Sequence, residues 1–329
     1  GRRFQIQPVW RADRPQKGRY REFYQCDADV IGSKSQLNEL ELVQIVDRVF
    51  TKFGINVAIK INNRKVLTGL AEIAGFPDKV TDITVAIDKL DKIGLEAVET
   101  EMKERGLTDQ AVAVIEPVLL LEGTTAEKIE TMRGLMQGKS ASGIVSETGL
   151  LGLDELAELF GFIEAAGVGQ KVEMDLSLAR GLNYYTGAIF EVKALDYAIG
   201  SICGGGRYDN LTGIFGLPGM SGVGISFGAD RIYDVLKGLD KFPKDIAGSA
   251  TVLFANMDTE ALSYIIPVVK SLREAGVACE IYPDKSKLKK QFDYADRKGI
   301  PFVSINGGDE AASGIVNLKN LSSGEQKTF

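Results

Sequence analysis

Basic side chains crowd the start of a chain that is acidic overall. The net charge of the 329 residues is −6, yet the first 21 residues carry seven cations: Arg2, Arg3, Arg11, Arg14, Lys17, Arg19 and Arg21. Two β-rich runs joined by a polar Pro/Gly connection carry them, which predicts a hairpin with cations at its tip. Because a guanidinium group offers a planar fork of donors, this hairpin could clamp phosphate or carboxylate groups. Taken alone, the hairpin is equally compatible with a solvated turn.

The second predicted strand of this hairpin has one polar face. Side chains of a strand alternate between its two faces, so every second residue lies on the same side. The first face carries Arg21, Phe23, Gln25, Asp27 and Asp29, and the second carries Tyr24, Cys26, Ala28 and Val30. A polar binding surface is therefore expected beside the cations, with a solvent-exposed face as the alternative.

The absence of histidine restricts the chemistry that this chain can perform. It removes the commonest general base, the Ser-His and Cys-His nucleophilic pairs and the usual nitrogen ligand of metals. Cys26, Cys203 and Cys279 form no CxxC pair, so neither a zinc site nor a disulfide framework is expected. We expect no metal bound by the protein itself and a reaction that depends on charge stabilisation.

Three later segments add residues that could join such a site. The turn ARGLNYYTG holds Arg180 beside Tyr184 and Tyr185, and SICGGGRYDNLTG contains three consecutive glycines, where something can approach the backbone closely. A Gly-rich strand, GVGISFG, then leads into a helix with Arg231 in its first turn. Its glycines do not fit GxGxxG, and no GxxxxGK[ST] loop occurs, so a nucleotide would need another device.

The rest of the sequence predicts the elements that position these residues. A helix is expected over 35–53 and a strand over 55–61. Residues 76–169 are rich in Glu and helix formers, which predicts an inserted helical domain. We expect residues 172–176 and 188–194 to be paired strands. From about residue 250 strands and helices alternate, which predicts a small α/β domain with a partly parallel sheet.

Composition places the chain among soluble globular proteins. It is 44% hydrophobic and 26% charged, and no apolar stretch is long enough to span a bilayer, so no membrane partner is expected. The sparse cysteines fit a reducing, cytoplasmic setting. No signal peptide is visible after Gly1.

Three motifs in order resemble those of the histidyl-tRNA synthetases, a family of class II aminoacyl-tRNA synthetases. RPQKGRYREFYQCDAD is similar to motif 2, with Arg11 and Asp13 at its RxE/D positions. LARGLNYYTG resembles the histidine-specific signature, with Asn183 where many members have Asp, and GVGISFGADRIY resembles motif 3 with Arg231. The resemblance covers essentially the whole chain. The family's N-terminal segment with motif 1 is absent from this sequence.

This resemblance implies an α/β (α+β) fold with the antiparallel-sheet core of class II synthetases. It assigns the predicted parts of the chain as the first part of the catalytic core (1–75), a helical insertion domain (76–169), the second part of the core (170–245) and an anticodon-binding domain (246–329). It also implies a homodimer for the full-length protein, because motif 1 builds the dimer interface.

The reaction implied by the resemblance is the ligation of histidine to its tRNA. ATP, accompanied by Mg²⁺ as its substrate complex, activates histidine to histidyl-adenylate, and the histidyl group then passes to the 3′ end of histidine tRNA. Arg11 and Arg180 would be catalytic and would contact both ATP and histidine. Arg19 and Arg231 would bind the β- and γ-phosphates.

The resemblance also implies which residues bind histidine. Gln25 would lie near the α-amino group, Asp29 and Tyr185 near the imidazole, and Tyr184 would shape the pocket. Gln25 and Asp29 share a strand face about 13 Å apart, so they could bracket a substrate. A site with partners for an imidazole would reject apolar amino acids.

Two other functions stay open at this point. One is a non-catalytic paralogue, such as the histidine-sensing regulatory subunit of ATP phosphoribosyltransferase, which shares the synthetase core but lacks the anticodon-binding domain. The other is a synthetase-like RNA-binding module with an inactive site. The Lys-rich helix of the tail could meet tRNA phosphates or simply be a solvated face.

Overall fold

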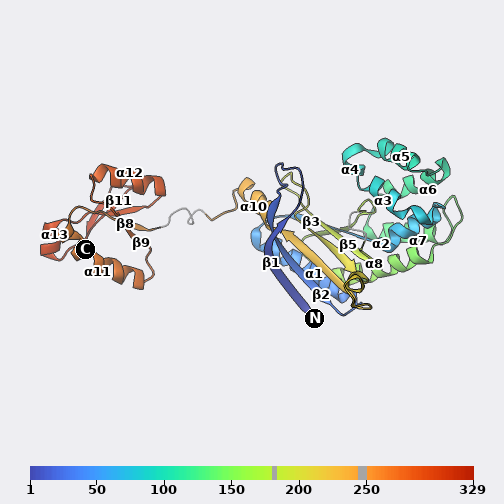
Figure 1. Cartoon of the computed structure of the whole chain (residues 1–329), viewed down its shortest axis with the longest axis horizontal. Coiled ribbons are helices and arrows are strands. Elements are labelled where there is room, and N and C mark those ends of the chain that lie inside the picture. Colours follow the sequence, from blue (N-terminus) through green and yellow to red (C-terminus); the bar gives the residue numbers. More distant parts are fainter. Residues whose placement is uncertain (180–183, 244–249) are drawn as a thin grey trace. The chain divides into compact units, whose positions relative to one another are not determined.

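The structure, a computed structural model, describes residues 1–179, 184–243 and 250–329. Its internal contacts divide the chain into two compact units, Gly1–Lys241 and Phe242–Phe329, each considered by itself below (Figure 1). Within the described ranges, no helix combines the length and the apolar character needed to cross a membrane.

A seven-stranded sheet forms the centre of the first unit. In spatial order its strands are β1 (Arg2–Trp10), β2 (Glu22–Ile31), β7 (Gly222–Gly228), β6 (Cys203–Tyr208), β5 (Ala188–Ala194), β3 (Val57–Asn63) and β4 (Lys171–Met174). Neighbouring strands of this sheet are antiparallel, except that β3 and β4 are parallel. The antiparallel core and the predicted hairpin of β1 and β2 are thus confirmed.

The predicted pairing of residues 172–176 with residues 188–194 is wrong. Both segments form strands, but β3 lies between them and pairs with β4 on one side and β5 on the other. A parallel pair needs a long crossover, and here the helical segment between β3 and β4 supplies it.

Helices of the first unit lie between and after these strands along the chain. They are α1 (Leu37–Phe53), α2 (Arg64–Ile73), the short 3₁₀ helix η1 (Pro77–Lys79), α3 (Val80–Ile87), α4 (Leu90–Ile93), α5 (Leu95–Glu104), α6 (Asp109–Leu119), α7 (Thr125–Met136), α8 (Glu147–Ala166), α9 (Leu211–Ile214) and α10 (Ala229–Gly238).

Helix α1 covers the apolar face of the sheet. It buries Leu42, Val46 and Phe50, and the Phe50 ring lies 5.9 Å from that of Phe227 in β7. Gly54 ends the helix with a φ of 66°, a left-handed conformation that glycine adopts without strain. With α1 on this side, the opposite face of β2 and β7 is left for polar side chains.

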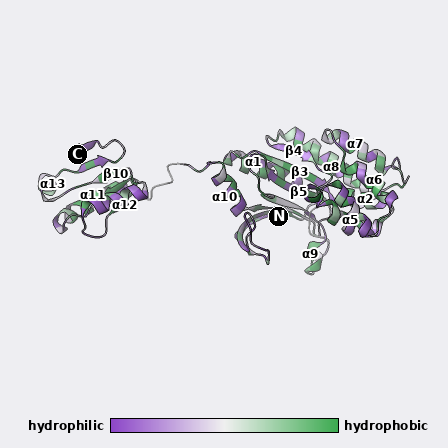
Figure 2. Cartoon of the chain, turned by 90° about the horizontal axis from the view of Figure 1, so that it is seen from above, coloured by the Kyte–Doolittle hydropathy of each residue, from purple (hydrophilic) through white to green (hydrophobic). Residues whose placement is uncertain are grey.

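The helical segment shares one hydrophobic core with the sheet. Its close packing depends on glycine, because a Cβ at Gly152 of α8 would lie 2.9 Å from the backbone nitrogen of Val66 in α2. Helix α9, in contrast, projects away from the sheet and is coloured hydrophobic in Figure 2. The division of the chain into four functional parts stays a prediction.

The second unit contains a five-stranded sheet with helices. Its strands in spatial order are β12 (Gln326–Thr328), β11 (Asn317–Asn320), β10 (Phe302–Ser304), β8 (Val252–Phe254) and β9 (Cys279–Ile281), and its helices are α11 (Thr259–Glu274), α12 (Leu288–Lys298) and α13 (Gly308–Ser313). The pairs β10–β8 and β8–β9 are parallel, and the others are antiparallel. The partly parallel sheet expected for the tail is confirmed.

Candidate active site

The face of the sheet opposite α1 gathers polar side chains over a floor of glycines. Gln25, Asp27 and Asp29 of β2 share this face, and Ser226 of β7 lies directly opposite Asp27. The intervening side chains of β2 pack into or against the core: Cys26, Ala28 and Val30. The register places these glycines of β6 and β7 on the polar face: Gly204, Gly206, Gly224 and Gly228. A bound molecule can therefore approach the backbone closely here.

Asp29 is held by two donors from different strands. The Tyr208 hydroxyl at the end of β6 donates to Asp29 Oδ1 at 2.6 Å, and Arg3 Nη1 of β1 lies 3.3 Å from Asp29 Oδ2. Glycine at position 224 is required for this arrangement, because a Cβ there would collide with the Asp29 carboxylate. Sequence reasoning found Asp29 but missed Tyr208, whose only signal was its place after the three glycines.

Tyrosine rings form the wall next to Asp29. The Tyr184 ring lies 4.8 Å from that of Tyr185 and 6.4 Å from that of Tyr208, both in edge-on geometry. Burial raises the pKa of Tyr185, and burial together with the hydrogen bond to Asp29 raises the pKa of Tyr208. Both hydroxyls therefore stay protonated at neutral pH and can donate hydrogen bonds. An acidic side chain beside aromatic rings suits a small, nitrogen-bearing ring.

Beyond β1 and β2, the hairpin presents its arginines to solvent. The Arg11 backbone nitrogen donates to Arg21 O at 2.9 Å, which continues the ladder and places Arg11 on the same face as Gln25. Its guanidinium lies 5.1 Å from the centre of the Phe23 ring. Arg19 lies in the tip, where its backbone pairs with Gln16. Among the described residues, neither Arg11 nor Arg19 forms an ion pair with a carboxylate.

Arg231 connects the start of α10 to the hairpin. Its Nε donates to Gly18 O at 2.5 Å and its Nη1 to Ser201 O at 2.6 Å, so it touches the hairpin turn directly. Asp230 accepts from the Tyr24 backbone nitrogen at 2.7 Å. The structure thus brings together two segments that are some 200 residues apart in the sequence, and Arg231 lies beside the tip that carries Arg19.

Arg180 and Asn183 lie outside the described residues, so their expected roles stay predictions. The chain leading to them is anchored by Asn62 of β3, whose Nδ2 donates to Leu178 O at 3.0 Å. On the other side, Tyr184 belongs to the tyrosine wall.

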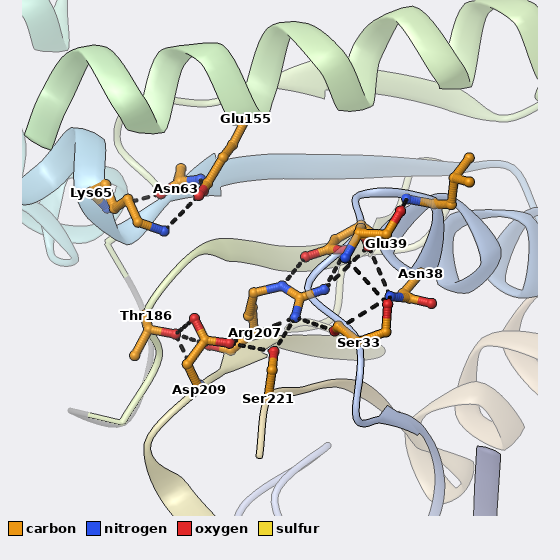
Figure 3. A network of polar contacts seen from close by, with 12 residues as sticks. Ser33, Asn38, Glu39, Asn63, Lys65, Glu155, Thr186, Arg207, Asp209 and Ser221 are labelled. Atoms are coloured by element: carbon orange, nitrogen blue, oxygen red, sulfur yellow. Dashed lines mark hydrogen bonds and ion pairs between the residues drawn. The ribbon is translucent and has the colours of Figure 1, made fainter. Parts of the chain in front are cut away.

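A buried arginine that sequence reasoning missed ties the strands around Asp29 together (Figure 3). Arg207 of β6 is 2% exposed and forms a bidentate ion pair with Glu39 of α1, with Nε–Oε1 at 2.5 Å and Nη2–Oε2 at 2.7 Å. Its Nη1 also donates to Ser33 O at 2.9 Å and to Ser221 Oγ at 2.5 Å. This guanidinium joins β6 to the β2–α1 connection and to the segment that leads into β7.

Asp209 extends this network toward the tyrosines. Its Oδ1 accepts from Ser221 Oγ, and its Oδ2 accepts from Thr186 Oγ1 at 2.9 Å (Figure 3). Thr186 directly follows Tyr185, and Arg207 directly precedes Tyr208. The network on the apolar side of β6 therefore holds the two segments that present tyrosines on the polar side.

Burial shifts the pKa values of the ionisable groups in this network. Burial raises the pKa of Glu39, although the hydrogen bonds from Arg207 oppose that shift. For Arg207, burial acts to lower the pKa, but the hydrogen bonds and charge of Glu39 outweigh it and raise the pKa above its ordinary value. Arg207 stays charged, and the bidentate geometry compensates for the loss of solvent around both groups.

The side chains of the polar face suit the binding of anions and the exclusion of apolar ligands. Proton transfer by a histidine side chain is not available, because the sequence contains no histidine. In the part of the chain that the structure describes, no three His, Cys, Asp or Glu side chains gather as a metal site. Arginines from the hairpin and from α10 lie at one end of the polar face, and Asp29 with its tyrosines lies toward the other. Such an arrangement can hold a molecule that is anionic at one end and carries nitrogen donors at the other.

Comparison with known proteins gives two family matches. The model described as histidyl-tRNA synthetase matches residues 2–232, and the model described as an anticodon binding domain matches residues 249–329. A protein named histidine–tRNA ligase from Phocaeicola vulgatus is 60% identical over 99% of this chain and 70% of its own length. One of the same name from Bacteroides fragilis is 58% identical over the same shares.

Solved structures show the same relationship. The crystal structure of histidyl-tRNA synthetase from Nostoc sp. PCC 7120 is 34% identical and superposes with a TM-score of 0.83, covering 100% of this chain and 75% of that one. A structure titled as an ATP phosphoribosyltransferase regulatory subunit/histidyl-tRNA synthetase from Bacillus halodurans shares the fold, with a TM-score of 0.70 at 21% identity over 89% of this chain and 71% of that one.

Proposed function

The chain belongs to the histidyl-tRNA synthetase family, and we propose that the polar face of its seven-stranded sheet is the site where histidine is activated. Its enzyme class is that of its relatives, the aminoacyl-tRNA ligases that join histidine to tRNA. The observation that carries the site assignment is the convergence on one face of Arg11, Gln25 and Asp29 with the tyrosine wall.

Activation needs charge stabilisation and alignment more than proton transfer. The histidine carboxylate, which is ionised at neutral pH, attacks the α-phosphorus of ATP. A carboxyl O–P bond forms, the bond between the α-phosphorus and the bridging oxygen breaks, and pyrophosphate leaves with Mg²⁺. Because no proton must be removed from the nucleophile, a chain without histidine can perform this step. A 3′ hydroxyl of the tRNA then attacks the acyl carbon, and AMP leaves.

The arginines are assigned to the anionic groups of this reaction. Arg11 would hold the attacking carboxylate and the α-phosphate, which its exposed position on the Gln25 face supports. Arg19 and Arg231 would bind the β- and γ-phosphates of the Mg²⁺–ATP complex at the hairpin tip. Arg180 keeps its proposed role at the α-phosphate on the strength of the resemblance alone.

The other end of the face is assigned to histidine. Gln25 would receive the α-amino group, and Asp29 with Tyr185 the imidazole, while Tyr184 shapes the pocket. The contact of Tyr208 with Asp29 supports this assignment, because it fixes the carboxylate in one orientation. An apolar amino acid offers no ring nitrogen to Asp29 and the tyrosines, so the site should discriminate against such substrates.

A regulatory-subunit function is not favoured over the ligase. The relatives at 50–60% identity are named histidine–tRNA ligases, and residues 249–329 match an anticodon binding domain. The structure that carries the regulatory name is 21% identical and therefore shows only the fold. Binding of tRNA through the second unit and a homodimer of the full-length protein complete the proposal.

Replacement of Arg11 tests the site assignment. In a single-turnover measurement of histidyl-adenylate formation, Arg11→Ala should slow the step by about a hundredfold or more, because it removes a charged donor from the reacting groups. Arg48→Ala is the matched control, since Arg48 is an exposed cation on α1, across the sheet from the site. Equal rates in the wild type and Arg11→Ala would contradict the assignment.

A further inference from the structure

Two side-chain oxygens on the polar face are buried and lack a partner. Asp27 Oδ1 and Ser226 Oγ are both shielded from solvent, and neither has a hydrogen-bond partner in the described structure. They come from opposed positions of β2 and β7, so they lie side by side on the face that carries Gln25 and Asp29. A buried carboxylate oxygen without a donor costs free energy, which points to a donor supplied by a ligand.

The residues beside Asp27 and Ser226 in the same row across the sheet either already have hydrogen-bond partners or are glycine. Reading across the strands, the row runs Gln5, Asp27, Ser226, Gly204 and Glu191. Gln5 accepts a hydrogen bond from Arg3, and Glu191 accepts one from Ser201. Gly204 leaves open the space beside Ser226. The unpaired oxygens are therefore at the centre of the face, between partnered residues on either side.

The adjacent acidic residue of β2 differs from Asp27 in this respect. Asp29 receives the Tyr208 hydroxyl at 2.6 Å and lies 3.3 Å from an Arg3 nitrogen. Asp27 forms no ion pair within the described ranges. No described residue pairs with the negative charge of Asp27, and a cationic donor is the group that would compensate it best.

Histidine, the proposed substrate, carries a cationic donor in either protonation state of its imidazole ring. The α-ammonium of histidine is protonated at neutral pH and has three N–H donors. Gln25, which the proposed function places near this group, is two residues from Asp27 on the same face, about 7 Å along the strand. An amide oxygen can accept from the ammonium but cannot neutralise it, whereas a carboxylate does both.

Resting on the proposed function, we propose that Asp27 is a further histidine-binding residue, whose Oδ1 accepts a hydrogen bond from the substrate α-ammonium, with Ser226 Oγ as a second acceptor. The pair would select for a free amino group, while Asp29 and the tyrosines select for the ring. Asp27 binds the substrate and takes no part in bond making.

Binding of two ligands that differ only in the ammonium group tests this assignment. Calorimetry on the chain would compare histidine with 3-(imidazol-4-yl)propionate, which keeps the ring and the carboxylate. For Asp27→Asn, the Kd of histidine should rise by about ten- to a hundredfold, the range for loss of a charged hydrogen bond. The Kd of the analogue should not rise. Ser226→Ala should weaken histidine alone, by a smaller factor.

Control variants and outcomes separate this inference from the proposed function. Asp78→Asn removes the same charge at an exposed position on η1 and should leave both Kd values unchanged. If Asp27→Asn binds histidine as the wild type does, or weakens both ligands by one factor, the ammonium assignment is wrong while the proposed function stands. If the wild type binds no histidine, both fail. Should Asp27→Asn not fold, Ser226→Ala decides by the same comparison.

Discussion

At the scale of single residues, the orientation of one carboxylate depends on one hydroxyl. Tyr208 donates to Asp29 from two strands away, across Gly222 and Gly224 of β7. Because the pKa of Tyr208 is raised by burial and by this bond, the hydroxyl stays a donor throughout the neutral range. The Asp29 carboxylate, which is proposed to bind the imidazole, is therefore oriented before the substrate binds.

Removal of this hydroxyl should affect histidine far more than ATP. Tyr208→Phe keeps the ring that packs on Tyr184 and deletes only the donor, so we expect the KM for histidine to rise about five- to twentyfold. The KM for ATP should change by less than about twofold. Steady-state ATP–pyrophosphate exchange measures both. A parallel rise in the two constants would instead indicate general damage to the sheet.

Local sequence could predict part of the site at this scale. The alternation of β2 depends only on the period of a strand, so Gln25 and Asp29 were correctly placed on one polar face. Tyr208 reaches Asp29 only because β7 pairs with β2 and β6 in one particular register. No pattern within a single segment encodes that register, which explains why Tyr208 was missed.

At the scale of secondary-structure elements, one buried ion pair connects α1, β6 and the chain around β7. Arg207 and Glu39 are 2% and 0% exposed, and the guanidinium also binds Ser33 and Ser221 (Figure 3). A buried pair is costly to break, because the remaining partner keeps its charge without solvent or counter-ion.

A single replacement in this pair should cost more stability than replacement of both partners. Arg207→Ala leaves Glu39 buried and unpaired, and we expect it to lower the free energy of unfolding by about 3–5 kcal/mol. Arg207→Met combined with Glu39→Leu removes both charges and should recover most of that loss. Urea unfolding followed by far-UV circular dichroism measures the difference. A double variant no more stable than Arg207→Ala would show that the charge itself is not the cause.

The pH dependence of stability should report on Asp209 in the same network. Burial acts to raise the pKa of Asp209, but hydrogen bonds from Ser221 and Thr186 and the charge of Arg207 outweigh it, so the pKa is lowered. An acid with a lowered folded pKa stabilises the fold above its unfolded pKa of about 3.9, and this contribution is lost as the pH falls through the folded value.

Asp209→Asn should therefore flatten the loss of stability on acidification. Between about pH 5 and pH 3, the free energy of unfolding of the wild type should fall more steeply than that of the variant. Urea titrations at several pH values give both slopes. Identical slopes would mean that Asp209 is not held ionised by this network.

The sequence predicted which segments form helices and strands better than it predicted which strands pair. The helix expected over 35–53 forms as α1, and the segments 172–176 and 188–194 do form strands. Their predicted pairing was wrong because β3, more than 100 residues earlier than β4, inserts between them. Helix period and strand period are local properties, whereas sheet order is decided by long-range packing.

At the scale of the whole molecule, the two compact units match two different domain families. The synthetase match ends at residue 232 and the anticodon-binding match begins at residue 249. The first unit holds the proposed activation site, and each unit has a hydrophobic core of its own. The order of strands and helices along the tail predicted its partly parallel sheet, because alternation of the two element types is visible in the sequence.

Deletion of residues 244–329 should therefore separate the two half-reactions. Histidine-dependent ATP–pyrophosphate exchange should stay within about threefold of the intact chain, while charging of histidine tRNA should fall by about a hundredfold, since binding energy for the tRNA is lost. Both assays use the same preparation. Equal losses in the two assays would show that the second unit is needed to maintain the first.

We propose that the polar face of the seven-stranded sheet activates histidine. ATP–pyrophosphate exchange by the chain measures this activity. It is compared with histidine, with no amino acid, and with phenylalanine or glutamine in place of histidine. We predict exchange with histidine at least about a thousandfold above the other conditions, because only histidine brings an imidazole to Asp29 and the tyrosines. Exchange that is absent with histidine, or equal with phenylalanine, would show that this face does not activate histidine.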